Sequence, residues 1–350
     1  MTLRQRIVAL IDRLANGARD DDARDALLLE LFAHQRAHVE PYARYVEQRL
    51  RGRAAQALSD VPALPTDAFR FARIASYPAR EDVRVFHSSG TTQDTRSTHA
   101  FRDLTLYDAA ARAAARHALF PDRERMALLV LAPHERELPD SSLSYMLTRF
   151  IEWFGTDGSS HVWPVSGPEL TRFVARLHAA TAAQMPVALL GTSFAFVHAL
   201  DALQERFTLP VGSRIMQTGG FKGRSREVAP DAMRAWLSDT FGVPDPQIIA
   251  EYGMTELSSQ LYESTAPRRL WWPGWTRVSV VHPETLLPVP HGEPGLVRID
   301  DLANVDSVAF IQTADLGVLT ADGLTLLGRA PAAGARGCSI TAVELLGGRS

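Results

Sequence analysis

The sequence is poor in cysteine and has no long apolar run. Its 350 residues include one cysteine, Cys338, so no disulfide can form within the chain and a reducing cytoplasm is the expected location. No apolar stretch reaches the roughly 20 residues that a transmembrane helix needs, so no membrane span is expected. The first residues contain no small-residue cleavage site after their short apolar patch, and no signal peptide is predicted.

Lysine is almost absent as well. Lys222 is the single lysine among 37 basic residues. Where arginine serves as the general surface cation, a retained lysine suggests chemistry, because a planar guanidinium does not replace a compact ammonium at a tight site. The alternative is an exposed lysine without a function.

The rest of the composition is that of an ordinary globular protein. Hydrophobic residues make up 46% and charged residues 22% of the chain, which supports a large core and excludes an intrinsically disordered protein. The formal net charge of -3 leaves no positive excess for binding nucleic acid. The length suits two average domains or one large domain.

Four regions follow one another along the chain. Residues 1–65 have apolar side chains at helical spacing and predict a helical N-terminal region. Residues 66–265 alternate short apolar runs with helical patterns, which predicts an α/β core with a mainly parallel sheet. Short strand patterns with frequent turns predict a β-rich subdomain over 266–329, and 330–350 form a short C-terminal segment carrying Cys338. The apolar positions expected on the inner helix faces are Ile7, Leu10, Ile11, Leu14, Leu27, Leu28, Leu31 and Phe32, and the expected buried strands are 126–132, 187–190 and 248–250.

A cluster of small hydroxyl residues around a glycine is the first candidate site, the phosphate loop. Ser88, Ser89, Gly90, Thr91 and Thr92 follow a strand-like segment and precede a helical pattern. Their backbone N–H groups and hydroxyls can converge on an anion, as binding of a nucleotide phosphate requires. The Gly-Lys-Ser/Thr ending of a P-loop is missing, and a plain loop is the alternative.

The second candidate, 251–256, directly follows an expected strand of the core. Loops at the carboxyl ends of parallel strands are where α/β sheets bind ligands. The ring of Tyr252 can stack on a base, the hydroxyl of Thr255 can bond a phosphate oxygen, and the carboxylate of Glu256 can hold Mg²⁺. A surface turn is the alternative for this segment taken alone.

The third candidate combines Asp315, in the sequence TADLG, with Arg329, which follows Gly328. An aspartate can accept hydrogen bonds from both hydroxyls of a ribose, and an arginine can pair with the same sugar or with a phosphate. Each pattern alone is weak. The ordered set of three candidates is far more specific than any one of them.

In this order the three segments resemble the motif series of the adenylate-forming enzymes, which include acyl-CoA synthetases, luciferases and nonribosomal-peptide adenylation domains. SSGTTQ resembles their phosphate loop, EYGMTE their aromatic–Gly–x–Thr–Glu motif, and QTADLG with LGR their ribose-binding motifs. The likeness covers about 60–345 and implies the large domain of that superfamily, an α/β fold with a parallel-sheet core and a β-rich subdomain. The C-terminal lid domain, with its adenylation lysine, is expected to be truncated or absent.

Within the superfamily, the chain resembles the LuxE-type acyl-protein synthetases, the ligase component of fatty-acid reductases. The matching features are VPALPTDAF at 61–69, the loop SSGTTQDTRS, the run Gly219-Gly220-Phe221-Lys222 and the terminal ARGCS. The resemblance implies that the loop holds pyrophosphate with Arg96 in place of its usual lysine, and that Lys222 lies near the nucleotide. The expected nucleotide-binding residues are Ser88, Ser89, Gly90, Thr91, Thr92, Arg96, Gly219, Gly220, Glu251, Tyr252, Gly253, Asp315 and Arg329; the metal ligand is Glu256, and the catalytic residues are Cys338, Lys222 and Thr255.

Cys338 lies in a polar, glycine-rich stretch beside Arg336, which suits an accessible and reactive thiol. A small buried side chain is the alternative for a lone cysteine. The surrounding segment resembles the superfamily motif whose loop glycine lines the channel of the acceptor thiol. On that likeness, Cys338 stands where the thiol of CoA otherwise arrives.

The predicted activity is that of an ATP-dependent acid–thiol ligase with ATP and Mg²⁺ as cofactors. It activates a carboxylic acid, fatty or aryl, as an acyl-adenylate and transfers the acyl group to Cys338. The acid pocket is expected to include 191–196, whose two phenylalanines favour an apolar acid, and an acyl-accepting reductase or carrier protein is the expected partner. Two alternatives stay open: an acyl- or aryl-CoA or carrier-protein ligase that uses an external thiol or amine, and a non-catalytic nucleotide-binding regulatory subunit.

Overall fold

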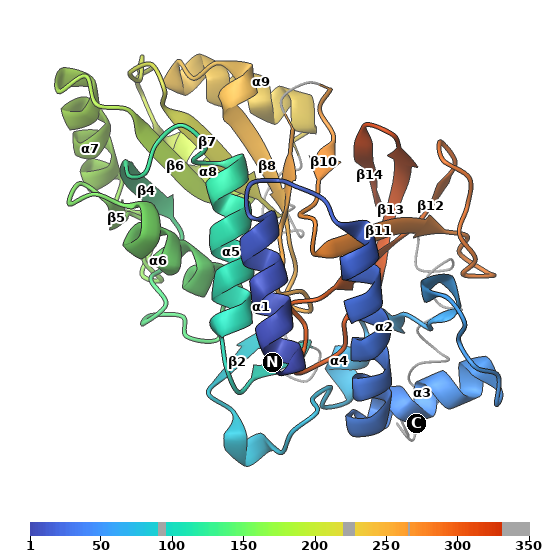
Figure 1. Ribbon diagram of the computed structural model, residues 1–350. Helices are drawn as coiled ribbons and strands as arrows, with labels where there is room; N and C mark the ends of the chain where they lie inside the picture. Colours follow the sequence, from blue (N-terminus) through green and yellow to red (C-terminus); the bar gives the residue numbers. More distant parts are fainter. Residues whose placement is uncertain (90–95, 220–227, 265–266, 331–350) are drawn as a thin grey trace. The chain divides into compact units, whose positions relative to one another are not determined.

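The computed structural model describes residues 1–89, 96–219, 228–264 and 267–330 (Figure 1). The chain divides into two compact units. Unit 1 consists of Met1–Ala114, Met254–Gln260 and Arg269–Ser350, and unit 2 of Ala115–Gly253 and Leu261–Arg268.

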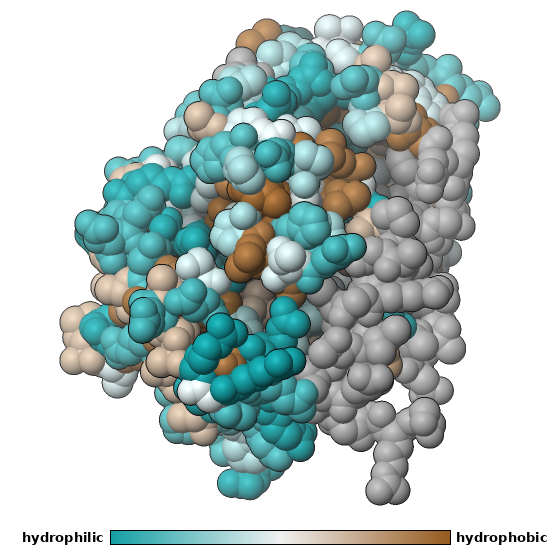
Figure 2. All heavy atoms as spheres, turned by 90° about the vertical axis from the view of Figure 1, so that its right-hand side faces the viewer, coloured by the Kyte–Doolittle hydropathy of each residue, from teal (hydrophilic) through white to brown (hydrophobic). Residues whose placement is uncertain are grey.

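Within the described ranges, no helix is both long and apolar enough to cross a lipid bilayer. On the face shown in Figure 2, hydrophilic residues predominate and the hydrophobic ones form small groups among them. The predicted short C-terminal segment, 330–350, lies almost wholly outside the described residues, and its boundary and the expected truncation of the lid domain stay predictions.

The N-terminal part of unit 1 is helical, as the apolar spacing predicts. The side chains of Thr2 and Asp20 accept hydrogen bonds from backbone N–H groups in the first turns of two helices, which satisfies donors that have no partner inside the helix. All eight apolar positions predicted for the inner faces are buried. The helices are α1 (Leu3–Leu14), α2 (Asp21–His38) and α3 (Glu40–Leu50).

An antiparallel sheet forms the β-rich part of unit 1 and confirms the strand pattern predicted after 266. Its order is β11-β12-β13-β14-β10, and the short strand β1 pairs in parallel with β13. Residues alternate between buried and half-buried along much of β11, as expected for a sheet with one covered face. The strands are β1 (Leu64–Pro65), β10 (Leu270–Trp271), β11 (Thr276–Val281), β12 (Pro294–Asp301), β13 (Phe310–Thr320) and β14 (Gly323–Arg329).

The predicted phosphate loop connects the two strands of a second sheet in unit 1. The strands β2 (Arg84–His87) and β3 (Thr98–Phe101) are antiparallel, and Phe86 lies opposite His99. The helical pattern predicted after the loop is confirmed, but the sequence does not reveal β3, whose four residues are too few to show a period. Helix α5 (Thr105–Ala118) follows β3. The short helices η1 (Leu58–Asp60), α4 (Ala68–Phe71) and η2 (Ala79–Glu81) all precede β2.

Unit 2 contains the predicted parallel α/β sheet. Its strand order is β5-β4-β6-β7-β8-β9, with every pair parallel except β8 with β9 (Figure 1). The three predicted core strands are confirmed. The sequence does not reveal β7, which begins with the buried Arg214; its guanidinium pairs with Asp122 at 2.8 Å. The strands are β4 (Ala127–Leu131), β5 (Ser160–His161), β6 (Val187–Thr192), β7 (Arg214–Thr218), β8 (Ile248–Tyr252) and β9 (Leu261–Glu263).

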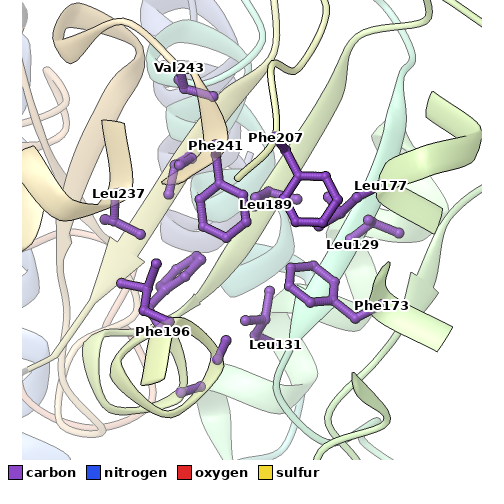
Figure 3. Packing of buried hydrophobic residues seen from close by; sticks show 14 of the residues in the cluster. Leu129, Leu131, Phe173, Leu177, Leu189, Phe196, Phe207, Leu237, Phe241 and Val243 are labelled. Atoms are coloured by element: carbon purple, nitrogen blue, oxygen red, sulfur yellow. The ribbon is translucent and has the colours of Figure 1, made fainter. Parts of the chain in front are cut away.

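The core of unit 2 lies between this sheet and its helices (Figure 3). Most of its side chains are aliphatic, and three phenylalanines pack on one another among them. The rings of Phe207 and Phe241 stack with their centroids 6.3 Å apart, and Phe173 packs edge-on against Phe241. Truncating such a buried ring to alanine removes about 3 to 5 kcal/mol of stability, so the sheet is a rigid support for loops at its edges. The helices are α6 (Ser142–Phe154), α7 (Leu170–Ala182), α8 (Ser193–Ala202), α9 (Pro230–Phe241) and the short η4 (Asp245–Gln247).

The two units cut across the four regions expected from the sequence. Unit 1 joins the helical region 1–65 to the β-rich region 266–329, and it also contains β2 and β3, which the sequence assigns to the α/β core. The reason lies in β3, since both ring nitrogens of His99 bond groups of unit 1. Proximity along the chain gives no indication of such long-range contacts.

Candidate active site

The ends of the predicted phosphate loop are held together at its base. The Ser88 hydroxyl accepts a hydrogen bond from the Ser97 backbone N–H at 2.9 Å, and the Ser88 N–H donates to the Ser97 carbonyl at 3.0 Å. Arg96 donates from Nε to the Ser88 carbonyl at 2.5 Å. Ser89 is exposed where the described part of the loop ends. Three predicted loop residues lie outside the described ones: Gly90, Thr91 and Thr92.

The predicted Thr255 and Glu256 lie in a segment of unit 1 without helix or strand, and buried side chains hold its backbone. The Thr255 carbonyl accepts a hydrogen bond from Nδ1 of His99 at 2.8 Å. The Glu256 carbonyl accepts one from Nδ2 of Asn304, also at 2.8 Å. Glu256 as a residue is only 7% exposed. The segment therefore has a fixed course although no hydrogen-bond ladder supports it.

Ser258 and Ser259, which follow Glu256 closely in the chain, donate hydrogen bonds to the carboxylate of Asp301 at the end of β12. One oxygen of its carboxylate accepts from the backbone N–H groups of Ser258 at 3.0 Å and Ser259 at 2.8 Å. The other oxygen accepts from the Ser259 hydroxyl at 2.7 Å and from the Ala303 N–H at 3.0 Å. Burial raises the pKa of Asp301, against the lowering effect of these four donors. One buried carboxyl thus organises two separate stretches of backbone.

His99 is a site residue that the sequence reasoning missed. It is 1% exposed and its ring lies against those of Phe69, at a centroid distance of 5.5 Å, and Phe101, at 4.2 Å. Burial lowers its pKa to about 4, so the imidazole is neutral near pH 7 and carries one N–H. Because the Thr255 carbonyl can only accept, that hydrogen is assigned to Nδ1, and Nε2 accepts from the Ser307 hydroxyl at 2.8 Å. The only signal in the sequence is a histidine between small and apolar residues just after the loop.

The two ribose-motif residues lie directly opposite each other on paired strands. Asp315 of β13 is the register partner of Arg329 of β14, and the guanidinium Nε is 3.5 Å from a carboxylate oxygen. The side chain of Arg329 is 81% exposed and that of Asp315 18%, so this pair adds little to stability, and the guanidinium is accessible to a ligand. The structure thus brings together two residues that the sequence separates.

The glycines of these motifs have structural explanations. A Cβ on Gly317 would lie 2.8 Å from a methyl group of Val297 and 3.0 Å from the Thr325 carbonyl, so only glycine fits between the strands. Gly328 has a φ of 107°, in the region that favours glycine. Both glycines shape the β13–β14 pair on which Asp315 and Arg329 stand.

In unit 2, predicted residues lie at the carboxyl ends of the adjacent parallel strands β7 and β8. The Thr218 hydroxyl donates to the carboxylate of Glu251, and burial raises the pKa of Glu251 to about 7. Gly219 follows β7 with a φ of 70°, Tyr252 ends β8, and Gly253 comes next. This sheet edge is where ligands of α/β proteins bind. The predicted Gly220, Lys222 and Cys338 lie outside the described residues.

We expect Glu251→Gln to stabilise the protein at alkaline pH. Between the ordinary pKa of 4.5 and the folded value of about 7, the native state binds the extra proton, so stability falls as pH rises through that range. Above pH 7 the buried charge costs about 3 kcal/mol, which neutral glutamine avoids while still accepting from Thr218. Urea unfolding of variant and wild type should differ by about this amount at pH 8 and hardly at pH 4. An equal difference at both pH values would contradict the assignment.

The two phenylalanines of 191–196, the segment expected to form part of the acid pocket, differ in their surroundings. Phe196 is fully buried in the core cluster of unit 2. Phe194 is only partly buried, and its ring contacts that of His198 edge-on at 4.5 Å. The helical period separates the two side chains, since positions two apart on a helix point in different directions.

A magnesium ion bound with a nucleotide needs few protein ligands. Among the described residues, no group of three or more histidine, cysteine, aspartate or glutamate side chains could hold a metal ion. Mg²⁺ in nucleotide sites is usually held by one or two carboxylates together with substrate phosphates. Glu256, with its backbone fixed on both sides, could supply such a carboxylate.

The parallel α/β unit, the antiparallel unit and the motif positions define the fold of the adenylate-forming enzymes. An open conformation of 2-hydroxyisobutyryl-CoA ligase in complex with 2-HIB-AMP and CoA matches with a TM-score of 0.64 at 16% identity, over 88% of this chain and 74% of that one. ATP-bound MatB from Rhodopseudomonas palustris matches with a TM-score of 0.50 at 17% identity, over 73% of this chain and 49% of that one. These likenesses confirm the predicted fold class.

The family follows from the sequence comparison. The model of the LuxE acyl-protein synthetases matches residues 14–346, and the chain belongs to this family. Two relatives are called long-chain-fatty-acid–luciferin-component ligase. The protein of Aliivibrio fischeri is 23% identical over 85% of this chain and 79% of its own length. The protein of Vibrio harveyi is 23% identical over 86% of this chain and 82% of its own length. The match confirms the predicted enzyme class, an ATP-dependent ligase that activates a carboxylic acid and transfers its acyl group.

Proposed function

We propose that the protein activates an apolar carboxylic acid with Mg·ATP and then accepts the acyl group on its own Cys338. In the first step the acid carboxylate attacks the α-phosphate, which forms an acyl-adenylate and releases pyrophosphate. In the second, the Cys338 thiolate attacks the acyl carbonyl, the bond to AMP breaks, and a thioester remains on the enzyme. The family match supports the activation chemistry, and the unique cysteine in a glycine-rich segment supports the acceptor.

The two hydrogen bonds of the His99 ring are the observation that supports the proposal best. His99 stands on β3, the strand that leaves the phosphate loop, and its ring bonds the Thr255 carbonyl and the Ser307 hydroxyl. Ser307 lies in the connection from β12 to β13, the strand that carries Asp315. Segments that adjoin or contain the three motifs therefore meet at one buried side chain, although they are far apart in the sequence.

The roles follow from the chemistry of each side chain. Thr255 would bond the α-phosphate, Glu256 would hold Mg²⁺, and Asp315 with Arg329 would bind the ribose hydroxyls. Pyrophosphate would be held by the backbone and hydroxyls of the loop, with Arg96 at its base. The remaining proposed nucleotide contacts are the ring of Tyr252 on the adenine, the glycines Gly219, Gly220 and Gly253 beside it, the carboxyl of Glu251, and Lys222 near the nucleotide.

The substrate and partner are proposed from the relatives. Their names specify a long-chain fatty acid, and the half-buried Phe194 at the start of α8 is compatible with an apolar acid. The acyl group on Cys338 would then pass to a reductase partner, as the resemblance to fatty-acid reductases implies. If a carrier protein or CoA is the acceptor instead, pyrophosphate exchange will occur without any acyl adduct on the protein.

ATP–pyrophosphate exchange with a panel of aliphatic and aromatic acids tests the activation step. We expect exchange that depends on both an acid and Mg²⁺, because a reversible adenylation returns labelled pyrophosphate to ATP. The acid that gives the fastest exchange identifies the substrate class. Nucleotide binding without exchange for any acid would contradict the proposal and favour a regulatory, non-catalytic subunit.

A further inference from the structure

We infer that His99 is a positioning residue for Glu256: together with Asn304 it fixes the two peptide groups on either side of the Glu256 Cα. This inference rests on the proposed function, because it concerns the carboxylate proposed to hold Mg²⁺. The Thr255 carbonyl belongs to the peptide before Glu256, and the Glu256 carbonyl to the peptide after it. Since each peptide is planar, fixing both carbonyls sets the direction in which the Glu256 side chain leaves the backbone.

The two donors are themselves immobilised. The His99 ring is bonded at both nitrogens and lies against Phe69 and Phe101, so it cannot rotate without breaking a contact. Asn304 accepts from the Ser258 hydroxyl at 2.6 Å, and its backbone carbonyl accepts from Nε2 of Gln35 at 2.7 Å. Support from rigid, buried neighbours is what holds a functional group within the narrow limits that catalysis requires.

The burial of His99 argues for a role beyond filling space. A buried polar group costs free energy unless it is bonded, so an apolar side chain such as leucine would fill position 99 without needing hydrogen-bond partners. The neutral imidazole instead bonds two segments that are otherwise irregular, at Thr255 and Ser307. A displacement of about 1 Å at a reacting centre can cost about 100-fold in rate, so small shifts of this backbone matter.

The test compares His99→Leu with His99→Asn in the full chain. Asparagine Nδ2 stands as many bonds from Cα as histidine Nδ1 and can donate to the Thr255 carbonyl, whereas leucine cannot. We expect His99→Leu to raise KM for Mg·ATP in the exchange reaction about 10-fold or more while KM for the acid changes little. His99→Asn should recover most of the loss. Val46→Ala, which truncates a fully buried residue of α3, is the control for destabilisation alone.

Hydrogen–deuterium exchange of peptides covering 254–260 gives a readout that needs neither ATP nor activity. We expect faster exchange there in His99→Leu, and exchange close to wild type in His99→Asn and Val46→Ala. These results would support positioning, because partial unfolding lowers kcat with the active fraction but leaves KM unchanged.

A failure of the inference about His99 can be told apart from a failure of the proposed function. An active wild type with His99→Leu unchanged in KM and in deuterium exchange of 254–260 would overturn the inference and leave the proposed function intact. The same holds if His99→Leu loses only kcat, in step with Val46→Ala. A wild type that shows no pyrophosphate exchange with any acid would overturn the proposed function and this inference with it.

Discussion

Cys338→Ser is expected to abolish acylation of the protein and to leave ATP–pyrophosphate exchange near the wild-type rate. Adenylation needs no thiol, whereas the second step needs a thiolate, and a serine hydroxyl is a far weaker nucleophile near neutral pH. Intact mass after incubation with Mg·ATP and acid should show an adduct on the wild type only. Hydroxylamine should release it, because a thioester is labile to that reagent.

The chain makes this experiment unusually direct. Cys338 is its single cysteine, so a thioester on the protein can have formed at no other residue. Ser339→Ala, which alters the neighbouring residue and keeps the thiol, is the matched control and should acylate normally. An adduct that persists at the same level in Cys338→Ser and resists hydroxylamine would show that a nucleophile other than a thiol carries the acyl group and would contradict the assignment to Cys338. Exchange without any adduct on the wild type would identify an external thiol or amine as the acceptor.

Asp301→Ala is expected to cause the largest loss of stability among the predicted substitutions, about 4 kcal/mol. The change leaves three backbone N–H groups without their acceptor, those of Ser258, Ser259 and Ala303, and each buried donor left unsatisfied costs about 1 to 3 kcal/mol. The expected result is a lower midpoint in urea unfolding with an unchanged slope.

Asp301→Asn separates the hydrogen bonds from the shape of the side chain. Asparagine keeps one acceptor oxygen for two of the donors, so we expect a loss intermediate between wild type and alanine. Asp12→Ala, at an exposed position of α1, is the control and should change stability by less than about 0.5 kcal/mol. A loss below about 1 kcal/mol for Asp301→Ala would show that water satisfies these donors, and Asp301 would then not be the anchor of this backbone.

Local patterns predicted most of the elements that have a clear period. The spacing at Ile7, Leu10 and Leu14 predicts α1, and the apolar runs at 126–132 and 248–250 predict β4 and β8. Elements with mixed or short patterns were missed: β7 because it begins with the buried Arg214, and β3 because four residues show no period. A local pattern reports on solvent exposure, and it fails where a polar side chain is buried with a distant partner.

The residues of the candidate site also fall into those that the sequence predicts and those that it does not. Its motifs could be predicted because their chemistry depends on residue type and order, as with Thr255, Glu256 and Asp315. His99 and Asn304, which bond the backbone carbonyls of Thr255 and Glu256, could not be predicted. Neither forms a recognisable pattern, and both contact residues that are distant in the sequence.

The fold class could be predicted from the alternation of short apolar runs with helical patterns, and the family from the resemblance that the ordered motifs carry, because both are features of residues that are neighbours in the chain. Two arrangements could be seen only in the folded chain. Asp315 of β13 lies opposite Arg329 of β14, and the ring of His99 bonds both the Thr255 carbonyl and the Ser307 hydroxyl. These contacts join residues up to 208 positions apart, between His99 and Ser307. They depend on how the strands pair and pack, which no local window of the sequence contains.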